Sequence, residues 1–317
     1  MDQYRINQIL RVAKLHYELG MSQLEIGKKE HLSKSTVSRL LKLASDMGMV
    51  RISIVEPSHT FTELEQDLMD LFPLKKVTIL PDVVGSPEII LRDVCQSLAN
   101  DLPHLVKDGS IIGIGWGKTT MALSRLLPVV KDKKLTVFQM NGSLSRILYD
   151  ARAYQIIQNF SEHLNAQGYL FPAPAMVDTK EIAQAIQADS SYQQIRGLAD
   201  QCDIAIYSLG IFDTQSIMYQ LGYFSQEQYR QLAKASSVDI CSHFIDIHGQ
   251  IADLSQDART LSVPLETIRN IPLKLVPVTG KEKAFPAYIA AKHGFIDYLY
   301  IDQPTARELR RLKKAES

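Results

Sequence analysis

The sequence predicts an α/β protein with a winged helix-turn-helix at its amino terminus. Short amphipathic helices with capping residues follow one another in the opening segment, and from Lys76 onward short apolar runs alternate with amphipathic helices. A chain of 317 residues also exceeds the usual size of one domain, about 100 to 200 residues. We expect the winged helix-turn-helix over 1–56, a linker helix within 57–75 and a larger α/β domain over 76–317.

Composition is that of an ordinary globular protein, with 45% hydrophobic and 22% charged residues. The sequence has no run of about 18 apolar residues and no signal-peptide pattern at its start, so we expect a cytoplasmic protein without a membrane partner. The three cysteines, Cys95, Cys202 and Cys241, lack metal-ligand spacing and cannot all pair with one another. We therefore expect buried thiols, and neither a metal nor a cofactor.

The net charge is zero, but the positive charge is unevenly distributed. Through Pro57 the chain carries nine lysines or arginines and six acids, and residues 33–42 carry Lys34, Arg39 and Lys42 with no acid. Because DNA phosphates attract such clusters, this segment is the expected contact with double-stranded operator DNA.

Two helices are predicted before this basic segment. Apolar residues recur at helical spacing from Ile6 to Tyr17, and Gly20 suits the left-handed position after a helix. Ser22 and Glu25 have the spacing of a capping box, which begins a short second helix. A tight turn then leads to a third helix, and three helices with this turn define a helix-turn-helix.

The third helix begins after Ser33, its N-cap, and runs to about Met47. His31 occupies the turn position where glycine is common, and histidine tolerates the left-handed conformation better than branched residues do. After Gly48, apolar and polar residues alternate up to Pro57, which predicts a strand of the wing. The inward residues of the helix are Val37, Leu40, Leu41 and Ala44, and those of the strand are Val50, Ile52 and Ile54.

The outer face of the third helix is polar and basic, and we predict that it enters the DNA groove. Arg39 is the expected bidentate base contact, while its neighbours would bind phosphates or bases. A merely solvated helix face is the alternative, but the caps, the turn spacing and the missing acids favour DNA. The segment SKSTVSRLLKLASDMGMV also resembles recognition helices of bacterial transcription regulators. The predicted DNA contacts are Ser33, Lys34, Ser35, Thr36, Ser38, Arg39 and Lys42.

A further helix is predicted between His59 and Leu71, where Phe61, Leu64 and Leu68 have helical spacing. It joins the wing to the larger domain. The pattern is equally consistent with a packed linker and with an element of a dimer.

Three loops rich in small residues follow predicted strands of the larger domain, where ligands of parallel sheets bind. Gly113–Thr120 lies between a strand and a helix, and offers backbone N–H groups and two hydroxyls to an anion. The loops 139–143 and 208–210 could each be a simple turn, but their recurrence at strand ends predicts a pocket. A nucleotide-hydrolysing P-loop fits less well, because its first glycine would fall on Ile112.

The order of motifs over residues 77–311 resembles the sorbitol-operon (SorC-type) family of regulators. The segments that carry the likeness are GIGWGKT, QMNGS, SLGI with LGYF downstream, VDICSHFIDIHG, DARTLSV, GKEKAFPAYIAA and YIDQPTAREL. The resemblance implies a Rossmann-like fold related to sugar-phosphate isomerases, a phosphorylated sugar as effector, and operator binding by a homodimer or homotetramer.

The resemblance also implies which residues hold the effector. The first glycine loop would hold the phosphate, Arg259 would face the ligand and Lys283 would add a cation. From the residues alone, Arg259 could equally form a surface ion pair with Asp257, and Lys283 would be a solvated lysine. The implied phosphate contacts are Gly115, Gly117, Thr119 and Thr120, and the other implied effector residues are Trp116, Asn141, Gly142, Gly210, Asp239, Arg259 and Lys283.

Asn141 marks a departure from one member of the family. The deoxyribonucleoside regulator has a lysine at the matching position, which can form a Schiff base with an aldehyde sugar. An amide is no amine nucleophile, so the resemblance here implies an effector that binds without a covalent bond.

The expected function is therefore a DNA-binding transcriptional regulator, a repressor of a carbohydrate or nucleoside catabolic operon, and not an enzyme. One alternative is a sugar-phosphate isomerase-like enzyme fused to a DNA-binding module. Its acid–base groups would be Asp239, His243 or Asp246, which lie on a predicted strand where packing or surface roles are more common. The other alternative is an architectural DNA-binding protein without a ligand.

Overall fold

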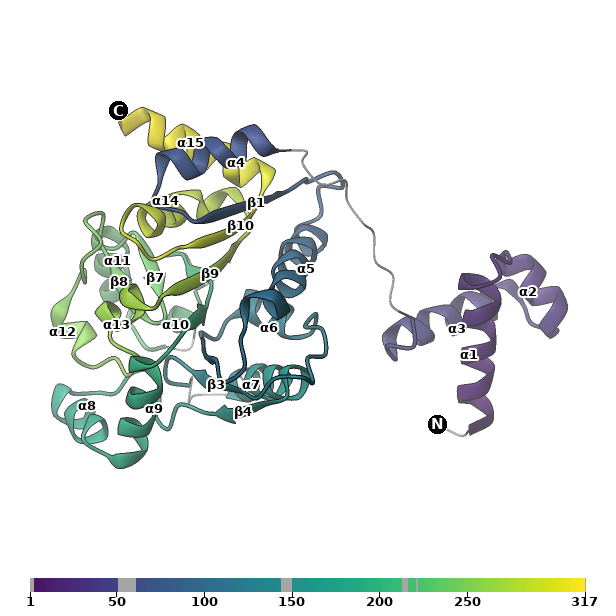
Figure 1. Ribbon diagram of the computed structural model, residues 1–317, viewed down its shortest axis with the longest axis horizontal. Helices are drawn as coiled ribbons and strands as arrows, with labels where there is room; N and C mark the ends of the chain where they lie inside the picture. Colours follow the sequence, from purple (N-terminus) through teal and green to yellow (C-terminus); the bar gives the residue numbers. More distant parts are fainter. Residues whose placement is uncertain (1–2, 51–60, 144–149, 213–215, 221, 317) are drawn as a thin grey trace. The chain divides into compact units, whose positions relative to one another are not determined.

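A computed structural model of the chain has two compact units, residues 1–60 and 61–317, which we describe separately (Figure 1). None of the described helices is long and apolar enough to cross a membrane. The predicted wing strand falls largely on residues 51–60, outside the described part of the chain. The structure describes residues 3–50, 61–143, 150–212, 216–220 and 222–316.

The amino-terminal unit contains the three predicted helices, α1 (Gln3–Tyr17), α2 (Gln23–Glu30) and α3 (Lys34–Asp46). The capping box between Ser22 and Glu25 is confirmed in both directions. The inward residues predicted for α3 are all buried, and they pack against Ile9, Val12 and Ile26 of the other two helices.

The turn between α2 and α3 depends on two local features. His31 has the predicted left-handed conformation, with φ 55° and ψ 41°. Gly27 is required for the close approach of the chain, because a Cβ atom there would lie only 2.7 Å from the carbonyl oxygen of Leu32. Ser33 caps α3 by accepting a hydrogen bond from the Thr36 amide at 3.1 Å.

The larger unit is built on a seven-stranded sheet in which every neighbouring pair of strands is parallel. The strand order is β1-β10-β9-β5-β2-β3-β4, and a second, antiparallel sheet has the order β6-β7-β8. The strands of the large sheet are β1 (Lys76–Leu80), β2 (Ile111–Ile114), β3 (Leu135–Gln139), β4 (Ala166–Tyr169), β5 (Ile204–Ile206), β9 (Leu273–Val278) and β10 (Tyr298–Asp302). The strands of the small sheet are β6 (Leu209–Gly210), β7 (Val238–Ile240) and β8 (His243–Ile245).

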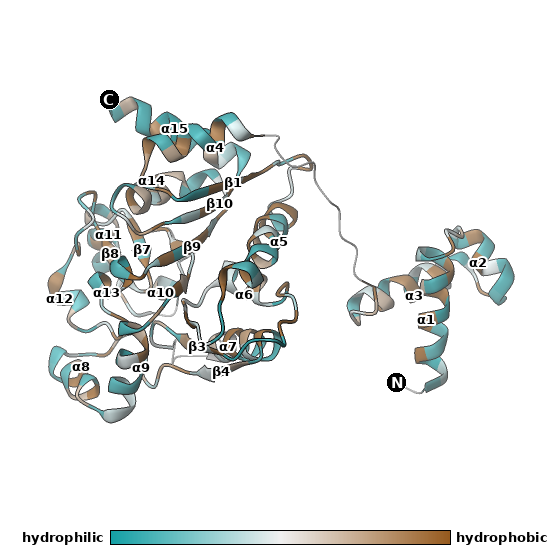
Figure 2. Ribbon diagram, in the orientation of Figure 1, coloured by the Kyte–Doolittle hydropathy of each residue, from teal (hydrophilic) through white to brown (hydrophobic). Residues whose placement is uncertain are grey.

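Helices cover both faces of the large sheet (Figure 1). Strand β5 shows why: Ile204 and Ile206 point into one apolar core and Ala205 into the other. Apolar residues accordingly dominate the central strands, while the outer helices carry polar surfaces (Figure 2). The helices are α4 (Thr62–Leu71), α5 (Pro87–Leu105), α6 (Lys118–Ser124), α7 (Asp150–Leu164), α8 (Lys180–Gln187), α9 (Ser190–Asp200), α10 (Ile217–Gln220), α11 (Gln226–Ala235), α12 (Leu254–Asp257), α13 (Leu265–Asn270), α14 (Ala284–Lys292) and α15 (Gln303–Glu316), with a 3₁₀ turn at Lys281–Lys283.

Helix α4, within the segment predicted as a linker helix, packs into the larger unit. Leu64 and Leu68 are buried in the core of that unit. The Glu65 carboxylate accepts a hydrogen bond from the Ile79 amide of β1 at 2.8 Å, and Asp67 pairs with Arg310 of α15 at 2.7 Å. These contacts fix α4 against β1 and α15, whereas a role for it in a dimer stays a prediction.

Candidate functional site

The predicted DNA contacts form one exposed surface on α3. Thr36 is half-buried, and the other six residues of the set are exposed. The hydroxyls of Ser35 and Thr36 lie 2.9 and 2.8 Å from Ser33 Oγ, so the first turn of the helix is held in place by its own side chains. Arg39 and Lys42 therefore project from a helix whose opposite face is fixed in a core, as a recognition helix requires.

A cavity of about 210 Å³ lies in the larger unit beside the carboxyl ends of β2, β3 and β5. These strands are neighbours in the sheet, so the three predicted loops do come together. Hairpin β7–β8 contributes a further part of the wall. Of the predicted effector residues, those that line the cavity are Trp116, Gly117, Thr119, Asn141, Gly210, Asp239 and Lys283.

Two of the predicted glycines, Gly115 and Gly142, lie next to the residues of the cavity wall without lining the cavity themselves. A Cβ atom on Gly115 would lie 2.8 Å from Tyr207 Cβ, and one on Gly142 would lie 2.3 Å from the carbonyl oxygen of Pro174. The Trp116 indole N–H donates to the Gly142 carbonyl oxygen at 2.8 Å. Both glycines thus allow the loops to pack closely, and neither is among the residues that line the cavity.

Two other predicted residues lie away from the cavity wall. Thr120 is buried beneath the loop, and its Oγ1 atom has no hydrogen-bond partner among the described residues. Arg259 lines a different cavity, between α11 and α12, and its guanidinium donates to the carbonyl oxygen of Asp178 at 3.5 Å. It lies in the turn that follows α12 and is not among the residues that line the cavity predicted for the effector.

Asp239 of β7 has an unusual electrostatic environment. Burial raises the pKa of its carboxyl group to about 6, although the hydrogen bond from the Ser242 amide and the nearby charge of His243 both act to lower it. The same carboxyl group lies close to Gly210, because a Cβ atom there would lie 2.8 Å from Asp239 Oδ2. The Asp239 carboxylate is therefore part of the cavity wall, where it is packed closely against Gly210.

Comparison with known proteins decides the family. The family model described as "Putative sugar-binding domain" matches residues 56–310. The chain belongs to the SorC-type sugar-binding family. It is 28% identical over 313 residues to the deoxyribonucleoside regulator of Bacillus subtilis (strain 168), which covers 98% of this chain and 99% of that protein. It is 27% identical over 308 residues to the sorbitol operon regulator of Klebsiella pneumoniae, with 96% and 98% of the two chains covered.

The likeness extends to solved structures. The crystal structure of the full-length sorbitol operon regulator SorC from Klebsiella pneumoniae matches with a TM-score of 0.72 at 27% identity. The match covers 96% of this chain and 99% of that chain, so it includes the helix-turn-helix unit as well as the larger domain. The predicted fold class and the predicted resemblance to SorC-type regulators are confirmed.

The cavity of this SorC-type protein also contains residues outside the predicted set. Lys118 and Ser208 lie within two of the loops that the sequence indicated, so their positions could have been included. Cys241 and Ser242 form the turn of hairpin β7–β8, and no local pattern connects that turn with Asn141 a hundred residues earlier. The remaining additional residues are Leu209, Ile211, Ser216 and Met218.

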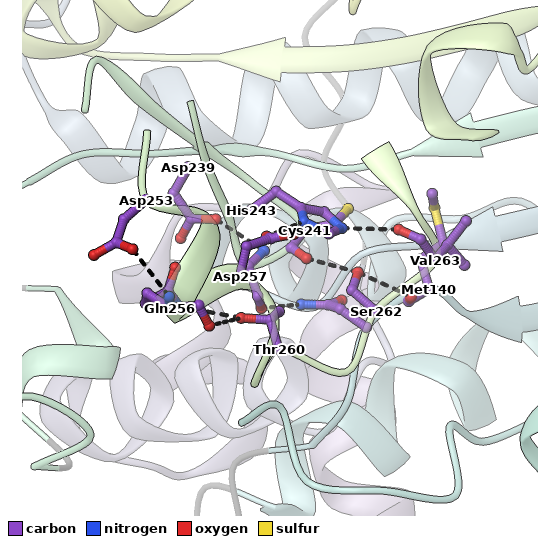
Figure 3. Close-up of polar contacts among 12 residues, drawn as sticks. Met140, Asp239, Cys241, His243, Asp253, Gln256, Asp257, Thr260, Ser262 and Val263 are labelled. Atoms are coloured by element: carbon purple, nitrogen blue, oxygen red, sulfur yellow. Dashed lines mark hydrogen bonds and ion pairs between the residues drawn. The ribbon is translucent and has the colours of Figure 1, made fainter. Parts of the chain in front are cut away.

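His243 anchors this hairpin through hydrogen bonds at both of its ring nitrogens (Figure 3). Its Nδ1 lies 2.7 Å from the Asp257 carboxylate and its Nε2 lies 2.9 Å from the carbonyl oxygen of Val263. Both partners are acceptors, so both ring nitrogens donate and the ring is an imidazolium. Burial acts to lower the pKa of His243, but the hydrogen bond and charge of Asp257, with the Val263 carbonyl, outweigh burial and raise it.

Because His243 pairs with Asp257, we expect part of the stability of the SorC-type fold to depend on pH. Because the pKa of His243 is higher in the folded state than its ordinary 6.5, the stabilisation is complete below pH 6.5 and is lost as pH rises through the folded-state pKa. Replacing His243 with glutamine should lower the free energy of unfolding by about 2 kcal/mol at pH 6, and by less at pH 9. Urea unfolding of both proteins at a series of pH values measures this difference.

Comparing wild type with His243→Gln across this pH range separates the effect of His243 from that of other titrating groups. Asp239 also binds a proton more tightly in the folded state, but its effect falls between its ordinary pKa of 3.8 and about 6, below the window of His243. A difference between wild type and His243→Gln that stays constant from pH 6 to 9 would show that the ring is not charged in the native state.

Proposed function

We propose that this chain is a DNA-binding transcriptional regulator, a repressor of a carbohydrate or nucleoside catabolic operon, whose DNA binding is controlled by a non-covalently bound phosphorylated sugar. The observation that carries the proposal is the pairing, in one SorC-type chain, of an exposed basic recognition helix with a cavity at the strand ends of a sugar-binding domain. The relatives named above are regulators of sugar and nucleoside operons, which favours the same role here.

The cavity has the chemistry that a phosphorylated sugar needs. Lys118 and Lys283 bring two cations to its wall, and Thr119 and Ser208 bring two hydroxyls near them. These groups suit a phosphate. Asp239 and Asn141 bring acceptors that suit sugar hydroxyls. Asn141 has no amine, so no imine can form at this position, and the proposed effector is held by hydrogen bonds and charge.

The helix-turn-helix unit supports recognition of an operator by more than one chain. Lys34, Arg39 and Lys42 of one α3 reach only a few base pairs and phosphates, so useful specificity needs two half-sites. We therefore propose that a homodimer or homotetramer binds the operator. The effector would act by changing how the recognition helices are spaced.

An isomerase-like reaction is not favoured by the placement of the candidate acid–base groups. Both ring nitrogens of His243 are occupied by Asp257 and Val263. Asp246 accepts hydrogen bonds from the amides of His248 and Gln250, which is a turn-forming role. Of the three candidate acid–base groups, only Asp239 lines the cavity, so the predicted set supplies no second member there for proton transfer.

Thermal denaturation with a panel of pentose and hexose phosphates tests the proposal. A ligand that binds only the folded state raises stability by mass action, by about 2.7 kcal/mol at 100 times its Kd. At least one sugar phosphate should raise the melting temperature and change the affinity for operator DNA, and the matching unphosphorylated sugar should do neither. If no member of the panel does so, the chain is not a sugar-phosphate-controlled regulator.

A further inference from the structure

The turn of hairpin β7–β8 adopts a conformation that its residues avoid. Cys241 and Ser242 have φ values of 50° and 71°, so both lie in the left-handed region. Two-residue hairpin turns of this kind usually contain asparagine or glycine, because other residues crowd their Cβ atoms there. Such conformations persist where the surrounding contacts determine them, and they gather at functional sites.

Hydrogen bonds to neighbouring segments hold this turn. The Ser262 hydroxyl donates to the Cys241 carbonyl oxygen at 2.8 Å (Figure 3). On the cavity side, Ser242 makes two hydrogen bonds, each with a residue of the cavity wall. Its amide donates to Asp239 Oδ1 at 2.9 Å, and its hydroxyl accepts from Asn141 Nδ2 at 2.9 Å.

Ser242 therefore sets the orientation of two side chains from different elements. Asn141 follows β3 and Asp239 belongs to β7, and both line the cavity. Because Ser242 bonds the amide nitrogen of Asn141, the amide oxygen of Asn141 remains available to accept a hydrogen bond. Because the Ser242 amide bonds Oδ1 of Asp239, the second carboxylate oxygen, Oδ2, remains available in the same way.

Both remaining atoms are hydrogen-bond acceptors. Asn141 Oδ1 is buried and has no partner among the described residues, and the residue as a whole is 2% exposed. Asp239 Oδ2 lies beside Gly210, where a Cβ atom would approach it to 2.8 Å. A buried acceptor without a donor is costly, and the cost is recovered when a donor arrives. A fully ionised phosphate is itself an acceptor, so it cannot fill this role.

We propose that Ser242 is a positioning residue that presents the Asn141 amide oxygen and the Asp239 carboxylate to the ligand, so that the site selects a sugar phosphate with two neighbouring hydroxyl groups over its deoxy analogue. This inference rests on the proposed function and specifies its ligand class. The hydroxyls donate to the two acceptors, while the phosphate lies toward Lys118 and Lys283. Asn141 and Asp239 contact the ligand, and Ser242 acts through them.

The test compares matched pairs of ligands. Ribose 5-phosphate is paired with 2-deoxyribose 5-phosphate, and glucose 6-phosphate with its 2-deoxy and 3-deoxy analogues, which between them remove every neighbouring pair of ring hydroxyls. Kd is measured by calorimetry on the full-length protein. In the pair that binds, wild type should bind the hydroxylated member about 10-fold or more tightly, because the analogue leaves an acceptor unpaired. Ser242→Gly should reduce this preference below about 3-fold.

Ser242→Gly is chosen because it keeps the amide that bonds Asp239, removes only the hydroxyl and relieves the left-handed conformation. It should therefore remain folded, and Ser242→Ala serves as a second variant with the same missing hydroxyl. The matched control is Ser236→Ala, which removes a buried serine hydroxyl outside the cavity. It should leave the preference unchanged.

The outcomes separate this inference from the proposed function. Binding of a sugar phosphate without a preference for the hydroxylated member overturns the inference alone. Retention of the wild-type preference by both Ser242 variants also overturns it, since the hydroxyl would then position nothing. Failure of every phosphorylated sugar to bind overturns the proposed function, and this inference with it.

Discussion

Replacing Arg39 with alanine should weaken binding to the operator by about 10- to 100-fold and relax the preference at one base pair of each half-site. The reason is geometric. Arg39 is exposed on α3, whose inner face is fixed by Leu40 and Leu41, and a planar guanidinium can bond two acceptors of one guanine. The measurement is a fluorescence titration against DNA selected by wild type from a random pool, followed by the same selection with the variant.

Two further variants separate base recognition from charge. Lys42→Ala should weaken binding to all sequences alike and reduce the dependence of affinity on salt, as loss of a phosphate contact does. Arg11→Ala removes a charge that is paired with Glu30 on another part of the same unit, and should change affinity little. If Arg39→Ala selects the same DNA as wild type, Arg39 touches phosphate only.

The helix-turn-helix could be predicted almost completely because its determinants are local. Ser22 with Glu25, and Ser33 with Thr36, each satisfy helix ends within three residues. His31 was expected in the left-handed position from the turn alone, and it has that conformation. Interactions over so few residues do not depend on the rest of the fold, so a pattern is enough to find them.

The larger domain was predictable where strands are apolar and buried on both faces. Strands β2, β3 and β5 have that pattern, and they carry the loops of the cavity. Strand β4 (Ala166–Tyr169) was not predicted, since it lies at the sheet edge and its AQGY sequence has no apolar run. The strand order also could not be predicted, because it depends on contacts between segments far apart in the chain.

The cavity was predictable only in part for the same reason. Glycine loops at strand ends indicated Gly117, Asn141 and Gly210, all of which line it. The hydrogen bond between Asn141 and Ser242 joins residues 101 apart in sequence, and no spacing rule expresses such a contact. Arg259 shows the converse, because a basic residue in a family motif does not by itself indicate which cavity the turn that carries it faces.

Substitutions of Thr119 and Thr120 should have different effects on ligand binding, although the sequence predicts the same phosphate-binding role for both. Thr119 lines the cavity, whereas Thr120 Oγ1 is buried without a partner among the described residues. Thr119→Val should weaken binding of the sugar phosphate by about 10-fold or more, because a hydrogen bond to a charged group contributes roughly 1.5 to 3 kcal/mol. The measurement is calorimetry with the sugar phosphate that gives the largest thermal shift.

Thr120→Val is the matched control, because it makes the same substitution one residue away. It should leave the Kd for that ligand within about 2-fold and raise the free energy of unfolding by about 1 kcal/mol, since valine removes a buried hydroxyl that has no partner. Operator affinity without ligand should be unchanged in both variants, because the recognition helix lies in the other unit. Equal losses of ligand affinity at Thr119 and Thr120 would mean that the loop rearranges as a whole on binding. In that case the phosphate would be held by the N–H groups and lysines around it, with neither hydroxyl acting as a specific contact.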